Sequence, residues 1–212
     1  WVRLAAVERS LEIGLWLDLA LPRLLSDLRA SAVREVAWMD YWEWAGPYLS
    51  ACGFRPLVEV ITLTKTGLDT PGGAATGGTL RAARSADLGP IVTIDRAAFA
   101  PYWWRSEATL ERRAAGASEF TVAEREGEVI GYAESELHLP AAHLNRMAVH
   151  PDEQGQGVGR LLLRDVVHTV WQRGVEELSL NTQRHNRRAR RLYEGFGFRA
   201  TGDAAQVWVL DV

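Results

Sequence analysis

The sequence has 212 residues, of which 47% are hydrophobic and 24% are charged, a balance that predicts a folded globular protein. Its net charge of −3 gives no indication of nucleic-acid or membrane binding. The sequence contains no run of about 18 apolar residues, so we expect no transmembrane helix. Its single cysteine, Cys52, excludes an internal disulfide, and no signal peptide is recognisable, so we expect a cytoplasmic protein. Because the sequence does not begin with Met, we also expect the native chain to extend upstream of Trp1.

Three segments follow one another along the chain: residues 1–66, a glycine-rich stretch at 67–78, and residues 79–212. The middle stretch holds five glycines, one proline and few apolar residues, a composition typical of a flexible linker. We therefore expect two structural parts of unequal length, joined by this linker.

The first segment resembles the last third of the chain. Leu4-Ala5-Ala6-Val7 matches residues 146–149, 142 positions later, and Cys52-Gly53-Phe54 matches residues 196–198, 144 positions later. Between these matches, both segments predict an apolar helix followed by a strand. A partial internal repeat is one interpretation. The other is that any two strand–helix–strand units align to this extent.

The third segment alternates between strand and helix patterns, and these predict an α/β fold with a sheet of mixed strand directions. Strands are expected at residues 80–83, 120–125, 129–137, 143–149, 177–181 and 207–210, and helices at 86–99, 105–115, 158–173 and 186–194.

The stretch 147–160 lies between a predicted strand and a predicted helix and is rich in glycine, at Gly155, Gly157 and Gly159. Glycines allow the backbone to turn sharply and to approach a ligand closely. The start of the helix offers unpaired N–H groups and the positive end of a dipole, which together suit a pyrophosphate. The glycine spacing matches neither a dinucleotide-binding fingerprint nor a P-loop.

Gln154, Gly157 and Gly159 form a Gln-x-x-Gly-x-Gly pattern, which resembles the motif that grips acetyl-CoA in the GNAT family of N-acetyltransferases. A second motif follows one helix and one strand later. There Asn186, Leu192-Tyr193-Glu194 and Gly195-Phe196-Gly197-Phe198 resemble the later signature of the same family. Two motifs in the right order identify residues 79–212 as a member of this family, and the resemblance implies the GNAT acyl-CoA N-acyltransferase fold.

The resemblance implies a role for each motif residue. The strand Met147-Ala148-Val149 would hold the pantetheine arm of acetyl-CoA, and a backbone N–H near Met147 would stabilise the thioester oxyanion. Asn186 would also contact pantetheine, and Tyr193 would protonate the leaving thiolate, unless it is only a core aromatic. The amides expected at the pyrophosphate are those of Gln154, Gly155, Gln156, Gly157, Val158, Gly159 and Arg160.

A general base must also remove a proton from the acceptor amine. On a regular strand, His143, Asn145 and Met147 would share one face. The segment resembles arylalkylamine N-acetyltransferases, where two histidines stand at the positions of His143 and Asn145, and here only the first is kept. His143 is therefore one candidate base, although a solvent-facing histidine is an equal interpretation. Glu134 and Glu136 on the preceding strand are competing candidates that could act through water.

Two further groups of residues have open roles. In the family, the region of Tyr102, Trp103 and Trp104 lines the acceptor pocket, and these aromatics, with Asn145, are candidate acceptor contacts or packed lid residues. Five arginines around the second motif either meet the 3′-phosphate of CoA or form a solvated helix face: Arg184, Arg187, Arg188, Arg190 and Arg191.

Residues 1–66 can be compared with the same two motifs, and they lack the glycine-rich loop. Glu8 and Glu12 stand near its position and only Gly14 remains, so we expect a degenerate GNAT-like half-domain that binds no CoA. Trp38, among other tryptophans, indicates packing against the catalytic part or against a second chain. An intrachain pseudo-dimer and a homodimer both fit this expectation.

These patterns predict an N-acetyltransferase that moves acetyl from acetyl-CoA to the primary amine of a small molecule or peptide by direct attack. The five histidines show no ligand spacing with cysteine, so we expect no metal. Alternatives are acetylation of a protein N-terminus or a ribosomal protein, a mycothiol-synthase-like role, and a non-catalytic acyl-CoA-binding regulator. The acceptor itself is not readable from the sequence.

Overall fold

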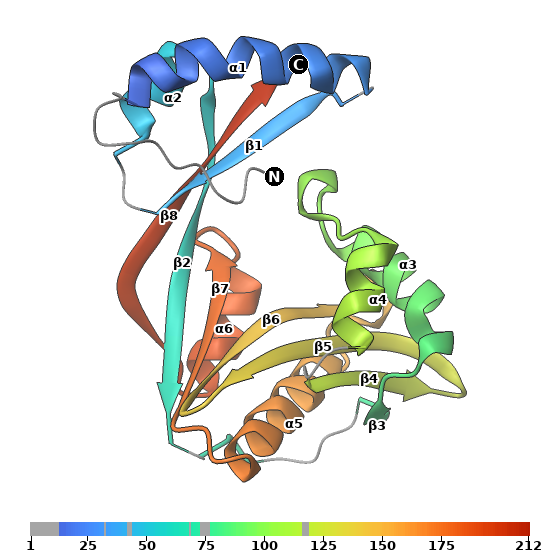
Figure 1. The fold of residues 1–212 in the computed structure, drawn as a ribbon. Helices are drawn as coiled ribbons and strands as arrows, with labels where there is room; N and C mark the ends of the chain where they lie inside the picture. The colour runs from blue at the N-terminus through green and yellow to red at the C-terminus, as the bar shows by residue number, and fades with distance from the viewer. Residues whose placement is uncertain (1–12, 32, 42–43, 68, 73–76, 116–118) are drawn as a thin grey trace. The chain divides into compact units, whose positions relative to one another are not determined.

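The structure is a computed structural model that describes residues 13–31, 33–41, 44–67, 69–72, 77–115 and 119–212. Figure 1 shows its helices and strands. The helices are α1 (Ile13–Ala30), α2 (Gly46–Ala51), α3 (Leu88–Ala98), α4 (Glu107–Ala115), α5 (Val158–Gln172) and α6 (Arg187–Gly195), with short 3₁₀ turns η1 (Ser85–Asp87), η2 (Pro101–Trp103) and η3 (Pro151–Glu153). The strands are β1 (Glu35–Asp40), β2 (Arg55–Thr66), β3 (Thr79–Ala82), β4 (Glu119–Arg125), β5 (Glu128–His138), β6 (Ala141–Val149), β7 (Glu177–Gln183) and β8 (Arg199–Asp211).

The strands are hydrogen-bonded in the order β1-β8-β2-β7-β6-β5-β4-β3. Neighbours from β3 to β6 run antiparallel, whereas β6 and β7 run parallel and are joined by the crossover helix α5. The predicted mixed α/β fold is therefore confirmed. The last strand, β8, pairs with β1, the first described strand of the chain.

The chain forms two compact units. The larger comprises residues 62–182 and 186–201, and the smaller comprises residues up to 61 together with 183–185 and 202–212. Most of β8 thus belongs to the smaller unit, and the described part of the glycine-rich stretch belongs to the larger one.

In the larger unit, helices cover both faces of the sheet (Figure 1). On one face, α3 and α4 pack over β4, β5 and β6, where Ile91, Ile94, Leu110 and Tyr132 are buried. On the other face, α5 turns one apolar stripe to the strands at the spacing of an amphipathic helix. The buried side chains of that stripe are Leu162, Leu163, Val166, Val167 and Val170. Strands β5 and β6 are therefore packed between two helical layers.

The smaller unit has a core of its own, made by α1, α2 and the strands beside them. Leu17, Leu49 and Phe54 are among its buried side chains. Asp40 is also buried, and its Oδ2 accepts hydrogen bonds from the backbone N–H groups of Ala45 and Gly46, each at 3.2 Å. This carboxylate satisfies donors at the start of α2 that would otherwise lack partners.

Several predicted bounds differ from the observed ones. The strand predicted at residues 207–210 is much longer, because pairing with neighbouring strands extends β8 back to Arg199. The helix predicted from residue 86 begins as the turn η1 and continues as α3 from Leu88. The repeat match at residues 4–7 lies outside the described residues.

Candidate active site

The glycine-rich turn between β6 and α5 is exposed at its tip. Gly155 and Gly157 have φ of 87° and 89°, a backbone conformation that other residues adopt only with strain. No described residue accepts a hydrogen bond from the backbone N–H of Gly155, Gln156 or Gly157. The first turn of α5 adds N–H groups that have no partner within the helix. The turn therefore offers several N–H donors and a positive helix end to an anion.

One predicted member of this cradle is covered. Val158 is buried, and the backbone of Gly77 lies so close that a Cβ built on Gly77 would sit 2.8 Å from the Val158 Cα. The glycine-rich stretch is held there by side chains of α5, since Arg160 donates to the Gly72 carbonyl at 3.1 Å and Arg164 to the Pro71 carbonyl at 2.8 Å. The accessible part of the turn thus runs from Gly155 to Gly157.

Gln154 connects the turn to two neighbouring elements. Its amide nitrogen donates to the Val149 carbonyl at 3.0 Å, and its amide oxygen accepts from Arg188 of α6 at 2.5 Å. The Arg188 guanidinium also lies near Gly155, because a Cβ built on that glycine would be 3.8 Å from it. A guanidinium beside the open N–H groups increases the positive potential of the turn.

The strands that flank the turn diverge. The parallel ladder of β6 and β7 extends from Ala141 opposite Glu177 to Leu144 opposite Leu180, and then stops. Both strands continue, β6 to Val149 and β7 to Gln183. The edge of β6 that faces β7 therefore has no ladder partner from Asn145 onward, and an extended ligand could add there as a strand does.

Helix α6 lies against the start of α5. A Cβ built on Gly159 would be 3.5 Å from Leu192, an ordinary van der Waals distance, so the two helices are in close contact at this point. Asn186 caps α6, its side-chain oxygen accepting from the Ala189 N–H at 3.1 Å. Tyr193 is 7% exposed, and burial raises the pKa of its hydroxyl to about 12. That phenol keeps its proton at neutral pH and can donate it.

A β-bulge in β6 changes which residues share a face. Glu134 of β5 pairs with Arg146 and Ser135 pairs with Leu144, so Asn145 is the extra residue. Asn145 donates to Glu136 at 3.3 Å on the face that α3 and α4 cover. Ala148, three residues later, packs on that same face, so its neighbour Met147 points to the other one. The prediction that Met147 shares the face of His143 and Asn145 is wrong, because the bulge reverses the alternation and turns Met147 to the opposite face.

His143 lies at the last rungs of the β6–β7 ladder, opposite Ser179 of β7. Its Nδ1 is 2.8 Å from the Ser179 hydroxyl, and its cross-strand neighbour on β5 is Glu136. Burial lowers the pKa of the imidazole below its ordinary value, although the nearby carboxylates of Glu136 and Glu134 act in the opposite direction. The ring is therefore neutral at pH 7 and can accept a proton.

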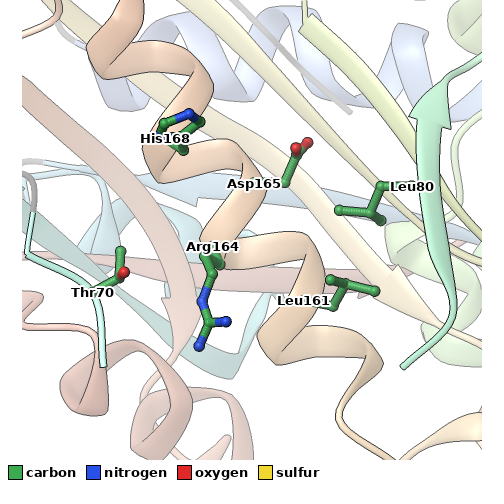
Figure 2. A pocket seen from close by; sticks show the side chains of 6 residues that line it. All are labelled: Thr70, Leu80, Leu161, Arg164, Asp165 and His168. Carbon is green, nitrogen blue, oxygen red and sulfur yellow. The ribbon is translucent and has the colours of Figure 1, made fainter. Parts of the chain in front are cut away.

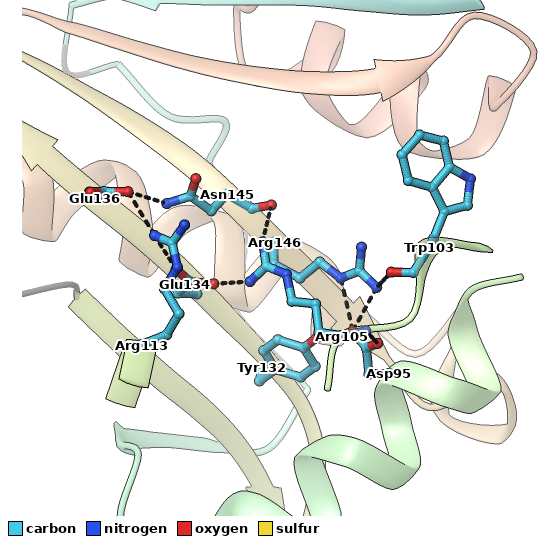
Figure 3. Close-up of polar contacts among 9 residues, drawn as sticks. All are labelled: Asp95, Trp103, Arg105, Arg113, Tyr132, Glu134, Glu136, Asn145 and Arg146. Carbon is cyan, nitrogen blue, oxygen red and sulfur yellow. Dashed lines mark hydrogen bonds and ion pairs between the residues drawn. The ribbon is translucent and has the colours of Figure 1, made fainter. Parts of the chain in front are cut away.

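Glu134, the competing base, is fully buried. Figure 3 shows its carboxylate between two guanidinium groups, those of Arg105 and Arg113. Arg113 lies 3.2 Å from Oε1 of Glu134 and also pairs with Glu136 at 2.7 Å. The hydrogen bond from Arg113 lowers the pKa of Glu136. A carboxylate shielded from solvent by two arginines is badly placed to receive a proton from an incoming amine.

A second buried carboxylate, Asp95 of α3, was not singled out by the sequence patterns. It accepts hydrogen bonds from the Tyr132 hydroxyl and, at 2.8 Å, from the Arg146 guanidinium (Figure 3). Burial and the charge of Asp95 raise the pKa of Tyr132. Arg146 also donates to the Trp103 carbonyl at 2.8 Å and stacks 3.5 Å above the Phe99 ring. Buried charges must be paired, so a carboxylate on the apolar face of a helix, as Asp95 is with Ile91 and Ile94, was the available signal.

Comparison with known proteins agrees with this geometry. The family model described as acetyltransferase (GNAT) family matches residues 90–198, slightly more than half of the chain. The chain belongs to the GNAT acetyltransferase family. It is 25% identical over 123 residues to a putative [ribosomal protein bS18]-alanine N-acetyltransferase of Bacillus subtilis, covering 58% of this chain and 82% of that protein. It is 37% identical over 78 residues to a mycothiol acetyltransferase of Thermomonospora curvata, covering 36% of this chain but only 26% of that relative.

Among solved structures, a GCN5-related N-acetyltransferase from Sphaerobacter thermophilus matches with a TM-score of 0.70 and 18% identity. That match covers 96% of this chain and 69% of the other, and it shows a shared GNAT fold. No helix within the described residues is both long and apolar enough to cross a membrane.

In this GNAT chain, the segment between α3 and α4 is held firmly on the sheet. Arg105 donates its backbone N–H to Asp95 and its side chain to the Asn145 carbonyl, both at 3.2 Å. The aromatic residues before it differ in exposure, since Tyr102 and Trp103 are half-buried and Trp104 is 43% exposed. The Trp104 indole N–H donates to the Phe99 carbonyl at 2.8 Å.

A separate pocket of about 370 Å³ opens on the flank of α5 (Figure 2). None of the site residues predicted from the sequence lines it; its walls are Thr70, Leu80, Leu161, Arg164, Asp165 and His168. Three of its polar side chains, those of Arg164, Asp165 and His168, already have partners in the protein. Asp165 accepts from Thr121 at 3.0 Å, and the His168 and Gln172 side chains lie 2.7 Å apart. We therefore do not propose this pocket as the reaction site. The site that we propose is the gap beyond the last rung of the β6–β7 ladder, which we call the open wedge.

Proposed function

We propose that the chain transfers an acetyl group from acetyl-CoA to the primary amine of a small molecule or peptide. One observation carries this proposal, namely the exposed glycine turn beside the point where the β6–β7 ladder stops. A diphosphate suits the N–H groups of the turn, and an extended arm suits the open edge of β6. Members of the GNAT family use acetyl-CoA.

The residues present fit coenzyme A. The diphosphate would be held by the backbone amides of Gly155, Gln156, Gly157, Gly159 and Arg160, with the Arg188 guanidinium beside them. The pantetheine arm would pair with the backbone of Met147-Ala148-Val149, although Gln154 must first release the Val149 carbonyl. Asn186 uses its side-chain oxygen to cap α6, so its amide nitrogen is the group offered to the ligand.

Acetyl-CoA supplies the thioester that the acceptor amine attacks directly. The backbone N–H near Met147 would stabilise negative charge on the carbonyl oxygen. Tyr193, which holds its proton up to about pH 12, would protonate the departing thiolate. His143 is the base that we propose, rather than Glu134, because its ring lies at the end of the ladder and is neutral. Tyr102, Trp103, Trp104 and Asn145 remain the proposed acceptor contacts.

A peptide N-terminus is the second candidate acceptor. The Bacillus subtilis relative, which this chain covers over most of its length, is described as acting on an alanine of ribosomal protein bS18. A peptide with an N-terminal alanine and a small aromatic amine would separate the two acceptor classes by their relative kcat/KM.

Calorimetry with acetyl-CoA and an assay of CoA release over a panel of amines together test the proposed function. We expect saturable binding and turnover on at least one amine. Binding without turnover on any member of the panel would favour a non-catalytic acyl-CoA regulator. No binding at all would refute the assignment of the glycine turn.

For the N-terminal segment we propose a degenerate GNAT-like half-domain at 1–66, followed by a linker at 67–78 and the catalytic domain at 79–212. Its described elements follow the order helix, strand, helix, strand, as do α5, β7, α6 and β8. This shared order of elements supports an intrachain pseudo-dimer. A monomeric mass in solution would favour this arrangement over a homodimer.

A further inference from the structure

Ser179 of β7 contacts two different groups of β6. Its hydroxyl oxygen is 2.8 Å from the His143 Nδ1, and the same hydroxyl donates to the Ala142 carbonyl at 3.2 Å. Ser179 and His143 are direct partners in the parallel ladder, one rung before the ladder stops. The pair therefore sits on backbone that is fixed by hydrogen bonds, at the end of the wedge in which we place the pantetheine arm.

These two contacts together indicate which nitrogen of the imidazole carries the proton. A carbonyl oxygen can only accept, so the one hydroxyl proton of Ser179 goes to Ala142. The lone pairs of the hydroxyl oxygen then face the His143 Nδ1, which must carry a proton to make a hydrogen bond. In a neutral ring this leaves Nε2 as the nitrogen with the free electron pair.

We propose that Ser179 is a positioning residue that holds His143 in the Nδ1–H tautomer and presents Nε2 as the base. This inference rests on the proposed function, because it specifies how the base of that reaction is oriented. In the step concerned, an N–H bond of the acceptor amine breaks and an Nε2–H bond forms. Ser179 accepts from Nδ1–H before and after the transfer, so no group at Nδ1 has to rearrange.

The charges around His143 suit this step. On β5, Glu136 is its cross-strand partner, and Glu134 and His138 are also close enough to influence its pKa. Arg113 of α4 pairs with Glu134 and Glu136. Burial keeps the resting ring neutral, and the two carboxylates then stabilise the imidazolium that forms when Nε2 takes up the proton.

The test combines nitrogen NMR of the full chain with kinetics. In the unmodified protein, the ¹⁵N shifts of His143 should identify Nδ1–H as the protonated nitrogen at neutral pH. In Ser179→Ala the ring should take up the Nε2–H tautomer in part, and kcat should fall about tenfold at an unchanged KM for acetyl-CoA. Ser179→Thr keeps a hydroxyl and should restore both readouts. Ser50→Ala, on the exposed face of α2, is the control that should change neither.

An Nε2–H tautomer in the unmodified protein would overturn the proposal, and so would a Ser179→Ala variant with unaltered shifts and turnover. The NMR result is independent of acetyl transfer. If no amine is acetylated but the Nδ1–H tautomer responds to Ser179, the proposed function fails while the geometry of the pair stands. If amines are acetylated and the tautomer does not respond, only the role of Ser179 fails.

Discussion

Helices α2 and α6 end in the same way but carry different chemistry. In α6, the N–H of Phe198 donates to the Tyr193 carbonyl and that of Gly197 to the Glu194 carbonyl. In α2, 144 positions earlier, Phe54 and Gly53 make the equivalent bonds to Leu49 and Ser50. Gly53 and Gly197 both have φ of 87°. Each helix thus ends in a Schellman motif, which needs a glycine in the left-handed conformation.

The difference lies in the side chain that each motif carries. Leu49 is completely buried at the position where α6 has Tyr193, so the smaller unit keeps the packing role and lacks the hydroxyl. The contrast teaches that both units share the helix ending, whereas only the larger unit has the tyrosine, to which we assign a role in the reaction. The following predictions test whether structure and chemistry separate in this way.

The largest effect is expected from Tyr193→Phe. Loss of the proton donor should lower kcat about 100-fold or more while the affinity for acetyl-CoA stays nearly constant. Tyr48→Phe, on α2 where Tyr48 is 42% exposed, is the matched control and should alter neither quantity. Steady-state kinetics and calorimetry measure both. Full turnover by Tyr193→Phe would remove the assignment of Tyr193 as the acid.

Leu49→Ala tests the structural role of the corresponding position in α2. Emptying this buried site should reduce the free energy of unfolding by about 2–5 kcal/mol. Acetyl-CoA affinity should not change at temperatures where the variant is folded. Urea denaturation and calorimetry check the two expectations, and a weakened affinity would mean that residues 1–66 take part in CoA binding.

Gly155→Ala and Gly53→Ala compare two glycines that both have φ of 87° and ordinary space around a new methyl group. Each substitution should cost about 1–2 kcal/mol of stability, because left-handed backbone is unfavourable for alanine. Only Gly155→Ala should weaken acetyl-CoA binding, by about tenfold, or 1.4 kcal/mol. An equal loss of affinity in Gly53→Ala would contradict a single CoA site at the turn of α5.

The smallest effect is expected from Arg188→Ala. Its guanidinium lies beside the glycine turn but is accessible to solvent, so its removal should weaken acetyl-CoA binding only about threefold and less at high salt. Arg191→Ala, an exposed arginine on the same helix, should have no measurable effect. Calorimetry at two salt concentrations distinguishes them, and equal losses would indicate a general electrostatic effect of α6.

Sequence patterns predicted the structure well where it depends on residues within a single helix or turn. The glycine turn, the amphipathic stripe of α5 and the ending of α6 depend on residues close together in the chain, and these predictions agree with the observed elements. The extent of β8 was missed because Ala200, Gly202 and Asp203 are poor strand formers. Pairing with distant strands supplies the hydrogen bonds that its own composition does not favour.

The candidate site shows the same limit. The bulge at Asn145 depends on the register between two strands, and one extra residue moved Met147 to the opposite face. The burial of Glu134 depends on arginines 29 and 21 residues before it in the chain. The strand register and these ion pairs join residues that are distant in the chain, so no periodic sequence pattern reveals them. The choice of His143 over Glu134 as the proposed base therefore required the folded structure.

By itself, the sequence determined the family and the position of the glycine turn to which we assign anion binding, because glycine conformation and helix polarity act over a few neighbouring residues. Tertiary structure alone decided which carboxylates are locked in ion pairs and which face each side chain of β6 takes, and the tautomer that we propose for His143 rests on it as well. Those properties depend on contacts between strands and helices that are remote in the chain, and such contacts exist only once the sheet has formed.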